Sequence, residues 1–195
     1  MTHHSAQDIA ALASIPGLRV YLPSDRFLTK ALMEVLVQDN DPAYIRVGRN
    51  AVEDVYDNVP ESFQMDKAVT VKEGTDVTLI ACGEMVKPAV EAAALLAEQG
   101  ISARVLDMYC IKPLDREAVE KAAQETRAIV TVEEHSLYGG MGSMVSQVVG
   151  ETHPVKVKNL ALPDEPAIAG KSGEVFAHYG LDAQGIAKAA QEALS

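Results

Sequence analysis

The sequence has few cysteines and no run of basic residues. Cys82 and Cys110 are the two cysteines among 195 residues, and they lack CxxC spacing. This argues against a disulfide framework or a cysteine-based metal site, and we expect no bridge between them in a reducing compartment. Seventeen Lys and Arg against 28 Asp and Glu leave a formal net charge of −11. No nucleic-acid partner is therefore expected, because binding a phosphate backbone needs clustered positive charge.

Long apolar runs are also absent. No run approaches the roughly 20 residues of a membrane span, and the N-terminus has no basic stretch followed by an apolar one. We therefore expect a cytoplasmic protein without a membrane partner. Hydrophobic residues nevertheless make up 48% of the chain. This predicts a globular chain with a substantial core and room for one full domain and part of another.

From Asp76 onward, apolar runs alternate with amphipathic helix patterns. Strands are predicted at 77–81, 103–108, 128–132 and 155–160, and helices at 85–99, 115–125, 143–149 and 183–194. Alternating strands and helices imply a parallel sheet with right-handed crossovers. The predicted fold class is therefore α/β, with residues 76–195 forming a complete three-layer αβα domain around a mostly parallel sheet.

A smaller α/β unit comes first. Its pattern predicts a helix that starts at Ser5, whose spacing from Asp8 fits a capping box, then strands at 19–22 and 43–47 with a helix between them. Two strands are too few to hold a core of their own. We therefore expect residues 1–50 to be a partial βαβ piece of a second α/β domain, whose first part is missing or lies on another chain. Residues 51–75 are interpreted as a linker, with an edge strand at 68–71.

Residues 128–145, AIVTVEEHSLYGGMGSMV, form a buried strand, a turn and a helix start. Glu133, Glu134 and His135 stand at the carboxyl end of this strand, where doubly wound sheets bind ligands. They could bind a metal or a partner amine, but a solvated strand end explains them equally well. The turn at Gly139–Gly142 does not fit GxGxxG, and the acidic residue of a dinucleotide site is missing.

Basic side chains near the start of the chain are the second set of candidates. Arg46 and Arg49 flank Gly48 at the end of a predicted strand, where a guanidinium could grip a phosphate or carboxylate, or form an ordinary ion pair. His3 and His4 precede a helix start, and an exposed polar tail would also explain them. Neither cysteine has a sequence-level partner that would make it a nucleophile.

Five segments, in this order, resemble the C-terminal section of transketolases, a thiamine diphosphate family. They are THHSAQDIAALASIPGLRVYLPSD, AYIRVGRN, DVTLIACGEMV, LDMYCIKPLD and VEEHSLYGGMGS. The resemblance covers nearly the whole chain, as the end of a pyrimidine-binding domain (1–50), a linker (51–75) and a C-terminal domain (76–195). It implies transfer of a two-carbon ketol unit between sugar phosphates, as in the pentose phosphate pathway, by a homodimer.

The resemblance also implies site residues and cofactors. It makes His3 a catalytic and substrate-binding residue above the thiazolium ring, and Arg49 the group that grips the substrate phosphate. The residues that hold the aminopyrimidine, and the motif for magnesium and the diphosphate, have no counterpart in this sequence. We therefore expect thiamine diphosphate and magnesium in the intact enzyme but no cofactor in this chain alone. The chain would be inactive without an N-terminal transketolase section.

Two other functions stay open. THH, IPG and IRVGR favour the transketolase branch, but part of a 2-oxoacid dehydrogenase β chain or of 1-deoxyxylulose-5-phosphate synthase would share this layout. The second alternative is a non-catalytic assembly or regulatory domain that binds a small ligand near Gly139–Gly142.

Overall fold

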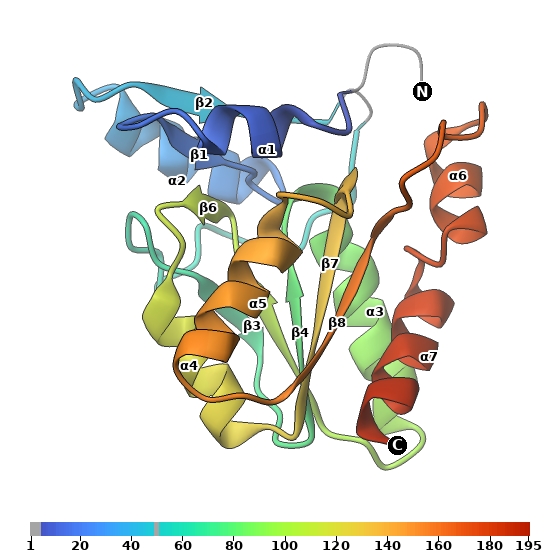
Figure 1. Ribbon diagram of the computed structural model, residues 1–195. Coiled ribbons are helices and arrows are strands. Elements are labelled where there is room, and N and C mark those ends of the chain that lie inside the picture. Colours follow the sequence, from blue (N-terminus) through green and yellow to red (C-terminus); the bar gives the residue numbers. More distant parts are fainter. Residues whose placement is uncertain (1–4, 49–50) are drawn as a thin grey trace.

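The computed structural model describes residues 5–48 and 51–195 (Figure 1). Its centre is a five-stranded sheet in the order β3-β5-β4-β7-β8. The parallel strands are β4 (Val77–Ala81), β5 (Ala103–Asp107), β7 (Ala128–Ser136) and β8 (Lys156–Leu162). The edge strand β3 (Val69–Lys72) runs antiparallel to β5. The α/β class with a mostly parallel sheet is thereby confirmed.

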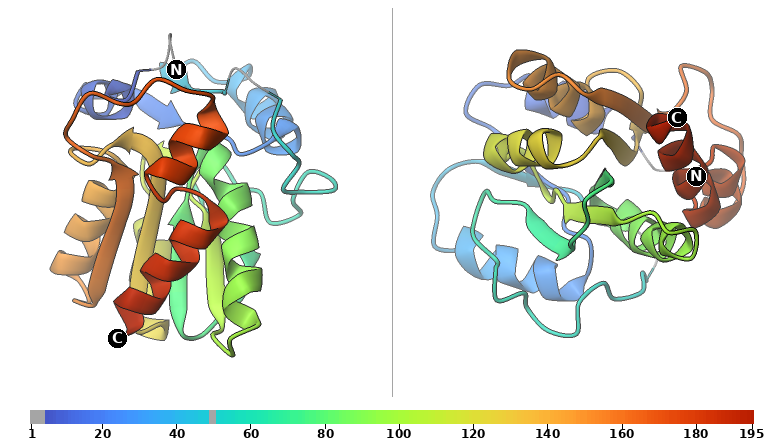
Figure 2. Two further views of the ribbon diagram at one scale, coloured as in Figure 1. Left: turned by 90° about the vertical axis from the view of Figure 1, so that its right-hand side faces the viewer. Right: turned by 90° about the horizontal axis from the view of Figure 1, so that it is seen from below.

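Helices cover both faces of this sheet. On one face lie α3 (Val86–Ala97) and α7 (Ala183–Leu194), and on the other lie α4 (Arg116–Glu125) and α5 (Met141–Glu151), as Figure 2 also shows. The alternation along β4 explains the layers. Val77 and Leu79 pack in the cluster of α3 and α7, whereas Ile80 packs in that of α4 and α5. Both faces of β4 are buried, and its one polar residue, Thr78, shares a hydrogen bond of 3.0 Å with the Thr126 hydroxyl.

The first section lies over the carboxyl ends of the central strands (Figure 1). It contains α1 (Asp8–Ala13), β1 (Arg19–Tyr21), α2 (Arg26–Leu36) and β2 (Ala43–Ile45). Its sheet has three strands in the order β2-β1-β6, because β6 (Cys110–Lys112) joins β1 in antiparallel pairing. We did not predict β6 from the sequence, since a three-residue strand directly after β5 has no periodicity of its own.

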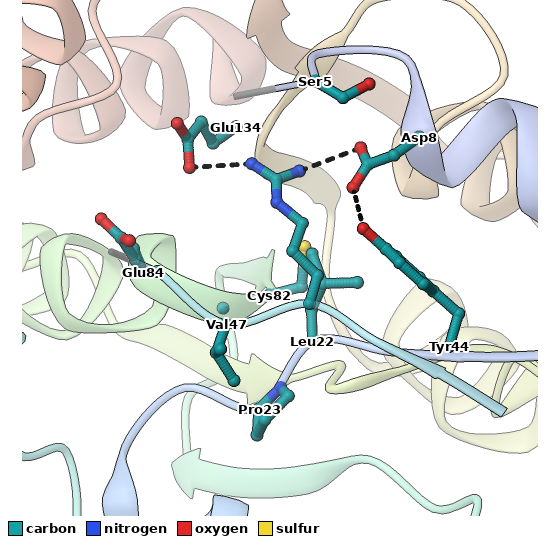
Figure 3. A pocket seen from close by; sticks show the side chains of 12 residues that line it. Ser5, Asp8, Leu22, Pro23, Tyr44, Val47, Cys82, Glu84 and Glu134 are labelled. Atoms are coloured by element: carbon teal, nitrogen blue, oxygen red, sulfur yellow. Dashed lines mark hydrogen bonds and ion pairs between the residues drawn. The ribbon is translucent and has the colours of Figure 1, made fainter. Parts of the chain in front are cut away.

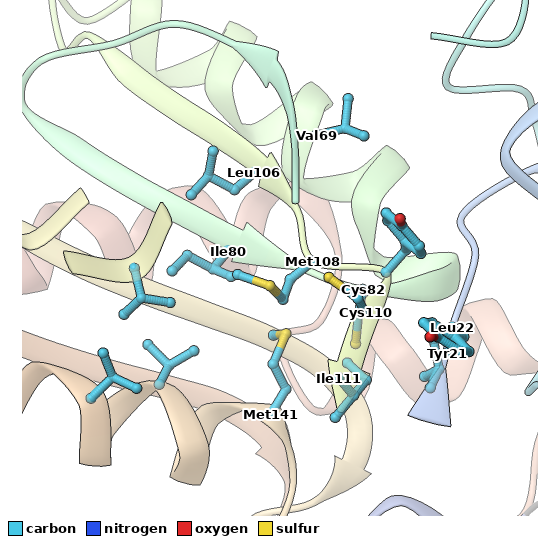
Figure 4. Packing of buried hydrophobic residues seen from close by; sticks show 14 of the residues in the cluster. Tyr21, Leu22, Val69, Ile80, Cys82, Leu106, Met108, Cys110, Ile111 and Met141 are labelled. Atoms are coloured by element: carbon cyan, nitrogen blue, oxygen red, sulfur yellow. The ribbon is translucent and has the colours of Figure 1, made fainter. Parts of the chain in front are cut away.

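The first section and the central sheet share one hydrophobic cluster (Figure 4). Tyr21 and Leu22 belong to the same buried cluster as Ile80 and Leu106 of the central sheet. A backbone bond of 2.7 Å from Leu22 N–H to Tyr109 O adds to this contact. The apolar side chains of β1 are therefore buried against the second section, and those of β2 pack partly buried against the same cluster.

Three further features differ from the predicted pattern or extend it. A capping box at Ser5 was wrong: α1 begins at Asp8, and Ser5 Oγ accepts from the Gln7 N–H instead. A 3-10 turn, η1 (Gly83–Met85), leads into α3, and a helix that we did not predict, α6 (Ser172–His178), precedes α7. Within residues 5–48 and 51–195, no helix is long and apolar enough to cross a membrane.

Candidate functional site

A cavity of about 430 Å³ opens between the first section and the carboxyl ends of β4 and β7. These neighbouring strands continue into crossovers that lead to opposite sides of the sheet, which is where open α/β sheets bind ligands. The lining residues come from both sections (Figure 3). They are Ser5, Asp8, Leu22, Pro23, Tyr44, Arg46, Val47, Gly48, Cys82, Gly83, Glu84 and Glu134.

Arg46 lines this pocket and is paired with two carboxylates. Its Nη2 donates to Glu134 Oε2 over 2.9 Å and its Nη1 to Asp8 Oδ1 over 3.4 Å. Asp8 Oδ2 accepts from the Tyr44 hydroxyl at 2.8 Å, and burial, together with Asp8, raises the pKa of Tyr44. The predicted alternative of an ordinary ion pair therefore describes Arg46 in this structure better than a phosphate clamp.

The rest of the described wall is apolar or acidic apart from Ser5. Leu22, Pro23 and Val47 line it beside Cys82 (Figure 3). Burial raises the pKa of the Cys82 thiol well above its ordinary value. A thiol in this state is a poor nucleophile at neutral pH, since the thiolate is the reactive form. Cys82 therefore serves as an apolar wall residue, and both Cys82 and Cys110 are free and buried.

Glu133, next to the pocket residue Glu134, faces the other way. Its carboxylate accepts the backbone N–H groups of Met141 at 2.7 Å and Gly142 at 2.8 Å. These are the first residues of α5, so Glu133 satisfies donors that a helix start otherwise leaves unpaired. Burial raises the pKa of Glu133 to about 7, against the opposing effect of the two N–H groups. Glu133 stabilises α5 rather than holding a ligand.

The glycine-rich turn is filled by the protein itself. A Cβ atom on Gly140 would overlap the Glu133 carboxylate, and one on Gly142 would lie 2.6 Å from Thr131 Oγ1. Gly139 has a φ of +75° and lies against Ala10 of α1. These glycines therefore serve close packing, and the N-terminus of α5 already binds a carboxylate of this chain.

His135 joins β7 to the first section. Its Nε2 accepts the Ala10 N–H at 3.3 Å, and its Nδ1 lies 2.8 Å from the Ser136 carbonyl oxygen, to which it donates in the corresponding tautomer. Burial lowers the pKa of His135, and a ring nitrogen that accepts the Ala10 N–H is the unprotonated one. Both nitrogens have protein partners, and the predicted metal role receives no support.

A second buried acidic group lies at the carboxyl end of β5, outside the pocket. Asp107 Oδ2 accepts from Ser24 Oγ at 2.5 Å and from the Tyr56 hydroxyl at 3.0 Å. Its Oδ1 is buried and has no partner among the described residues. Burial raises the pKa of Asp107 to about 7, and nearby Asp25 acts in the same direction. Asp25 caps α2 and accepts the backbone N–H groups of Val55 and Tyr56, so the two acids anchor the segment after residue 50.

His3, His4 and Arg49 lie outside the described residues, so their predicted roles stay predictions. Of the described candidates, Arg46 and Glu134 meet in the pocket, whereas Glu133 and His135 make internal contacts. Sequence reasoning missed Tyr44 and Glu84, and it assigned Asp8 to helix capping. An aspartate three residues after a serine is a common local pattern. Nothing in the sequence therefore showed whether Asp8 caps a helix or pairs with Arg46. The described residues also contain no group of three His, Cys, Asp or Glu arranged to hold a metal ion.

Comparison with family profiles gives two matches that together span most of the chain. The profile described as "Transketolase, C-terminal domain" matches residues 66–186, and the profile "Transketolase, pyrimidine binding domain" matches residues 1–54. The pocket is therefore lined by residues of both matched regions, with Asp8 and Arg46 from one and Glu134 from the other.

Individual proteins are similar over nearly the full chain. A subunit of the apulose-4-phosphate transketolase of Phocaeicola vulgatus is 51% identical over 191 residues, which are 98% of this chain and 61% of that protein. "Putative transketolase C-terminal section" of Methanocaldococcus jannaschii is 35% identical over 193 residues, 98% of this chain and 60% of that protein. "1-deoxy-D-xylulose-5-phosphate synthase 1" of Geobacter sulfurreducens is 36% identical over 197 residues, 100% of this chain but 31% of that protein.

One solved structure is similar in both sequence and fold. "Split gene transketolase, inactive beta4 tetramer" superposes with a TM-score of 0.89 at 36% identity, covering 99% of this chain and 62% of that one. The chain thus spans about three fifths of the length of the subunit-sized proteins that it matches, and less of the synthase.

Proposed function

Because this chain belongs to the transketolase family and corresponds to the C-terminal part of such an enzyme, we propose that it forms the substrate-facing side of an active site that transfers a two-carbon ketol unit between sugar phosphates. The observation that carries this proposal is the pocket at the carboxyl ends of β4 and β7, whose walls come from both matched regions. The names of two similar proteins, an apulose-4-phosphate transketolase subunit and a 6-deoxy-6-sulfo-D-fructose transketolase subunit, support a sugar derivative as substrate.

Within this proposal, His3 and Arg49 contact the substrate. Asp8 follows His3 by five positions and Arg46 precedes Arg49 by three, and both Asp8 and Arg46 line the pocket. A phosphate needs a guanidinium with free N–H groups, and Arg46 already donates to two carboxylates. Arg49 is therefore the better candidate for binding the phosphate, and His3 for contacting the phosphate or the hydroxyl groups of the sugar.

Thiamine diphosphate, as the cofactor of this family, supplies the carbanion chemistry of ketol transfer when bound. The described pocket residues do not fit its diphosphate, because three carboxylates, from Asp8, Glu84 and Glu134, would repel it and one guanidinium is already paired. Nor do the described residues contain a group of three His, Cys, Asp or Glu arranged to hold its magnesium. We therefore propose that an N-terminal transketolase section, the chain's main partner, holds thiamine diphosphate and magnesium. This chain's residues would bind and orient the sugar.

The test is Arg49→Ala in the enzyme that contains this chain together with its cofactor-binding section. We expect KM for phosphorylated donors to rise by the equivalent of about 1.5 to 3 kcal/mol, the usual effect of losing a charged hydrogen bond, with a much smaller change for unphosphorylated donors. Arg127→Ala is the matched control, because Arg127 is exposed and pairs with Asp76 far from the pocket. Equal effects of Arg49→Ala on both donor kinds would remove Arg49 from the phosphate site.

A measurement on the chain by itself tests the division of roles. We expect no ketol transfer and no saturable thiamine diphosphate binding by calorimetry until the N-terminal section is added. Saturable binding of the cofactor by this chain alone would contradict the proposal that another section holds it.

The similarity to 1-deoxyxylulose-5-phosphate synthases supports a second candidate activity. Such an enzyme would release carbon dioxide from pyruvate in the presence of glyceraldehyde 3-phosphate, whereas a transketolase would consume a ketose donor without releasing it. Assaying both reactions with one preparation of the intact enzyme separates the two.

The finer assignments are proposals of the same kind. They are the divisions at 1–50, 51–75 and 76–195, a homodimer in the cytoplasm, and a place in pentose phosphate metabolism. Among the described strands, β2 pairs with β1 on one edge and with no strand on the other. This free edge supports the proposal that an adjoining section adds further strands to this sheet. Light scattering of the intact enzyme tests the homodimer.

A further inference from the structure

The pocket contains a charged bridge that links three elements from distant parts of the sequence. Arg46 follows β2, Asp8 begins α1 and Glu134 lies on β7. The Arg46 guanidinium donates to both carboxylates, over 2.9 Å to Glu134 and 3.4 Å to Asp8, and dashed lines in Figure 3 mark the contacts that reach these two labelled residues. The side chains of Arg46, Asp8 and Glu134 are 14%, 10% and 8% exposed. Little water competes for these bonds, so the bridge holds its geometry better than a surface ion pair.

Further hydrogen bonds hold Asp8 and Arg46 in place. Asp8 also accepts from the Tyr44 hydroxyl of β2 at 2.8 Å. The Arg46 backbone N–H donates to Tyr21 O of β1 at 2.9 Å, which sets where the side chain leaves the sheet. Arg46 therefore makes both ion pairs only when β2, α1 and β7 hold the relative positions seen in this structure.

The segment that follows Arg46 is held equally closely. Gly48 lies against Glu84 of η1, since a Cβ atom on Gly48 would overlap the Glu84 carboxylate. Val47 and Gly48 both line the pocket between these two attachments. The wall formed by residues 46–48 thus has one fixed position relative to the central sheet.

We propose that Arg46 is a positioning residue for the substrate site: its bridge from Asp8 to Glu134 sets the distance between the α1 side and the β7 side of the pocket, without contacting the substrate phosphate. This rests on the proposed ketol transfer at this pocket. Removing the bridge lets the two sides shift, and a misplacement of about 1 Å can cost on the order of 100-fold in rate. The loss should be the same for every donor, phosphorylated or not.

The test compares Arg46→Met and Arg46→Lys with Arg49→Ala in the intact enzyme, each with phosphorylated and unphosphorylated donors. We expect Arg46→Met to lower kcat/KM by roughly 10- to 100-fold for both donors alike. Arg46→Lys should lose less, again equally, because one ammonium group reaches one carboxylate at a time. The double variant Arg46→Met/Glu134→Gln should be no worse than Arg46→Met, since both changes break one bridge.

The matched control is Arg104→Met. Arg104 is also buried, 9% exposed, and pairs with Glu125 at 2.6 Å and Glu73 at 3.4 Å, but it lies near the amino end of β5, away from the pocket. We expect Arg104→Met to lower the melting temperature and leave kcat/KM of the folded enzyme unchanged.

Three outcomes would overturn the proposal. Folded Arg46→Met with wild-type kcat/KM for both donors would show that the bridge positions nothing. Loss confined to phosphorylated donors would make Arg46 a phosphate ligand. A wild-type enzyme that turns over no sugar donor would reject the proposed function itself, and this is told apart from the other two by the wild-type assay.

Discussion

The carboxylate of Glu133 occupies the space that a side chain at Gly140 would need. Glu133 stays in that position because it accepts the N–H groups of Met141 and Gly142 at the start of α5. Gly140 is thus needed because the Glu133 carboxylate must lie close to the backbone of the turn in order to cap α5.

Gly140→Ala should therefore destabilise the protein. The added methyl group would push Glu133 off the helix start and leave buried N–H groups unpaired, at a cost of about 1 to 3 kcal/mol in the free energy of unfolding. Urea unfolding measures this cost. Gly150→Ala, near the other end of α5, is the control: nothing lies within 4 Å of its Cβ position, and alanine is more favourable than glycine in a helix by up to about 1 kcal/mol. Equal stability of the Gly140→Ala variant and the wild type would contradict this interpretation of the turn.

Glu133→Ala should lower the free energy of unfolding by a similar amount, about 1 to 3 kcal/mol, because the same two N–H groups lose their acceptor. The double variant Glu133→Ala/Gly140→Ala should cost less than the sum of the single changes, since the missing carboxylate makes room for the methyl group. Glu91→Ala, at an exposed position of α3, serves as the control. Strictly additive losses would mean that Glu133 and Gly140 act independently.

Asp107→Asn should change how stability depends on pH. Burial raises the pKa of Asp107 to about 7 in the folded protein, from an ordinary value of 3.8. Between these values the unfolded chain releases the proton and the folded protein keeps it, so this group's stabilising contribution is full below pH 3.8 and is lost as pH rises to 7. The slope approaches about 1.4 kcal/mol per pH unit within that window.

The asparagine variant has no such carboxyl group. Its free energy of unfolding, compared with that of the wild type, should therefore improve as pH rises from 3.8 to about 7 and stay level above that. Urea unfolding at several pH values across and above this window measures the difference. Asp57→Asn, at an exposed position, should leave the pH dependence unchanged. Parallel curves for wild type and Asp107→Asn would show that Asp107 ionises in the folded protein at an ordinary pH.

The two thiols should react slowly with a disulfide reagent in the folded protein and quickly in urea. Cys82 and Cys110 are buried, and burial raises the pKa of each. The thiolate is the reactive species, so both access and ionisation limit the rate. Val37→Cys supplies a matched exposed thiol, since Val37 is 67% exposed. Fast labelling of two native thiols at the rate of that added cysteine would contradict the buried positions.

Periodicity in the sequence predicted most elements of the central sheet. The predicted strand at 77–81 has the bounds of β4, and the helix predicted at 115–125 differs from α4 by one residue. Both patterns are contained in a single short stretch, because strand alternation and helix amphipathicity depend on neighbouring residues. The strand predicted at 128–132 was too short, because β7 continues to Ser136. The charged residues Glu133 and Glu134 end the apolar run on which that prediction was based.

The candidate site was predicted only in part. Arg46 and Glu134 were both candidates, but nothing in the sequence joined them, since they stand 88 positions apart. Asp8 was assigned to a helix cap and became a partner of Arg46 instead. A local pattern such as capping spacing cannot reveal a competing partner that arrives from another part of the chain.

The sequence by itself determined the α/β class, the order of most strands and helices, and the family, because these depend on local periodicity and on motifs in a fixed order. The tertiary structure alone decided which charged residues meet. Glu133 and Glu134 are adjacent in sequence, yet one caps α5 and the other faces the pocket. Successive side chains of a strand point to opposite sides, and what each side chain meets there depends on how α5 and the first section pack against β7.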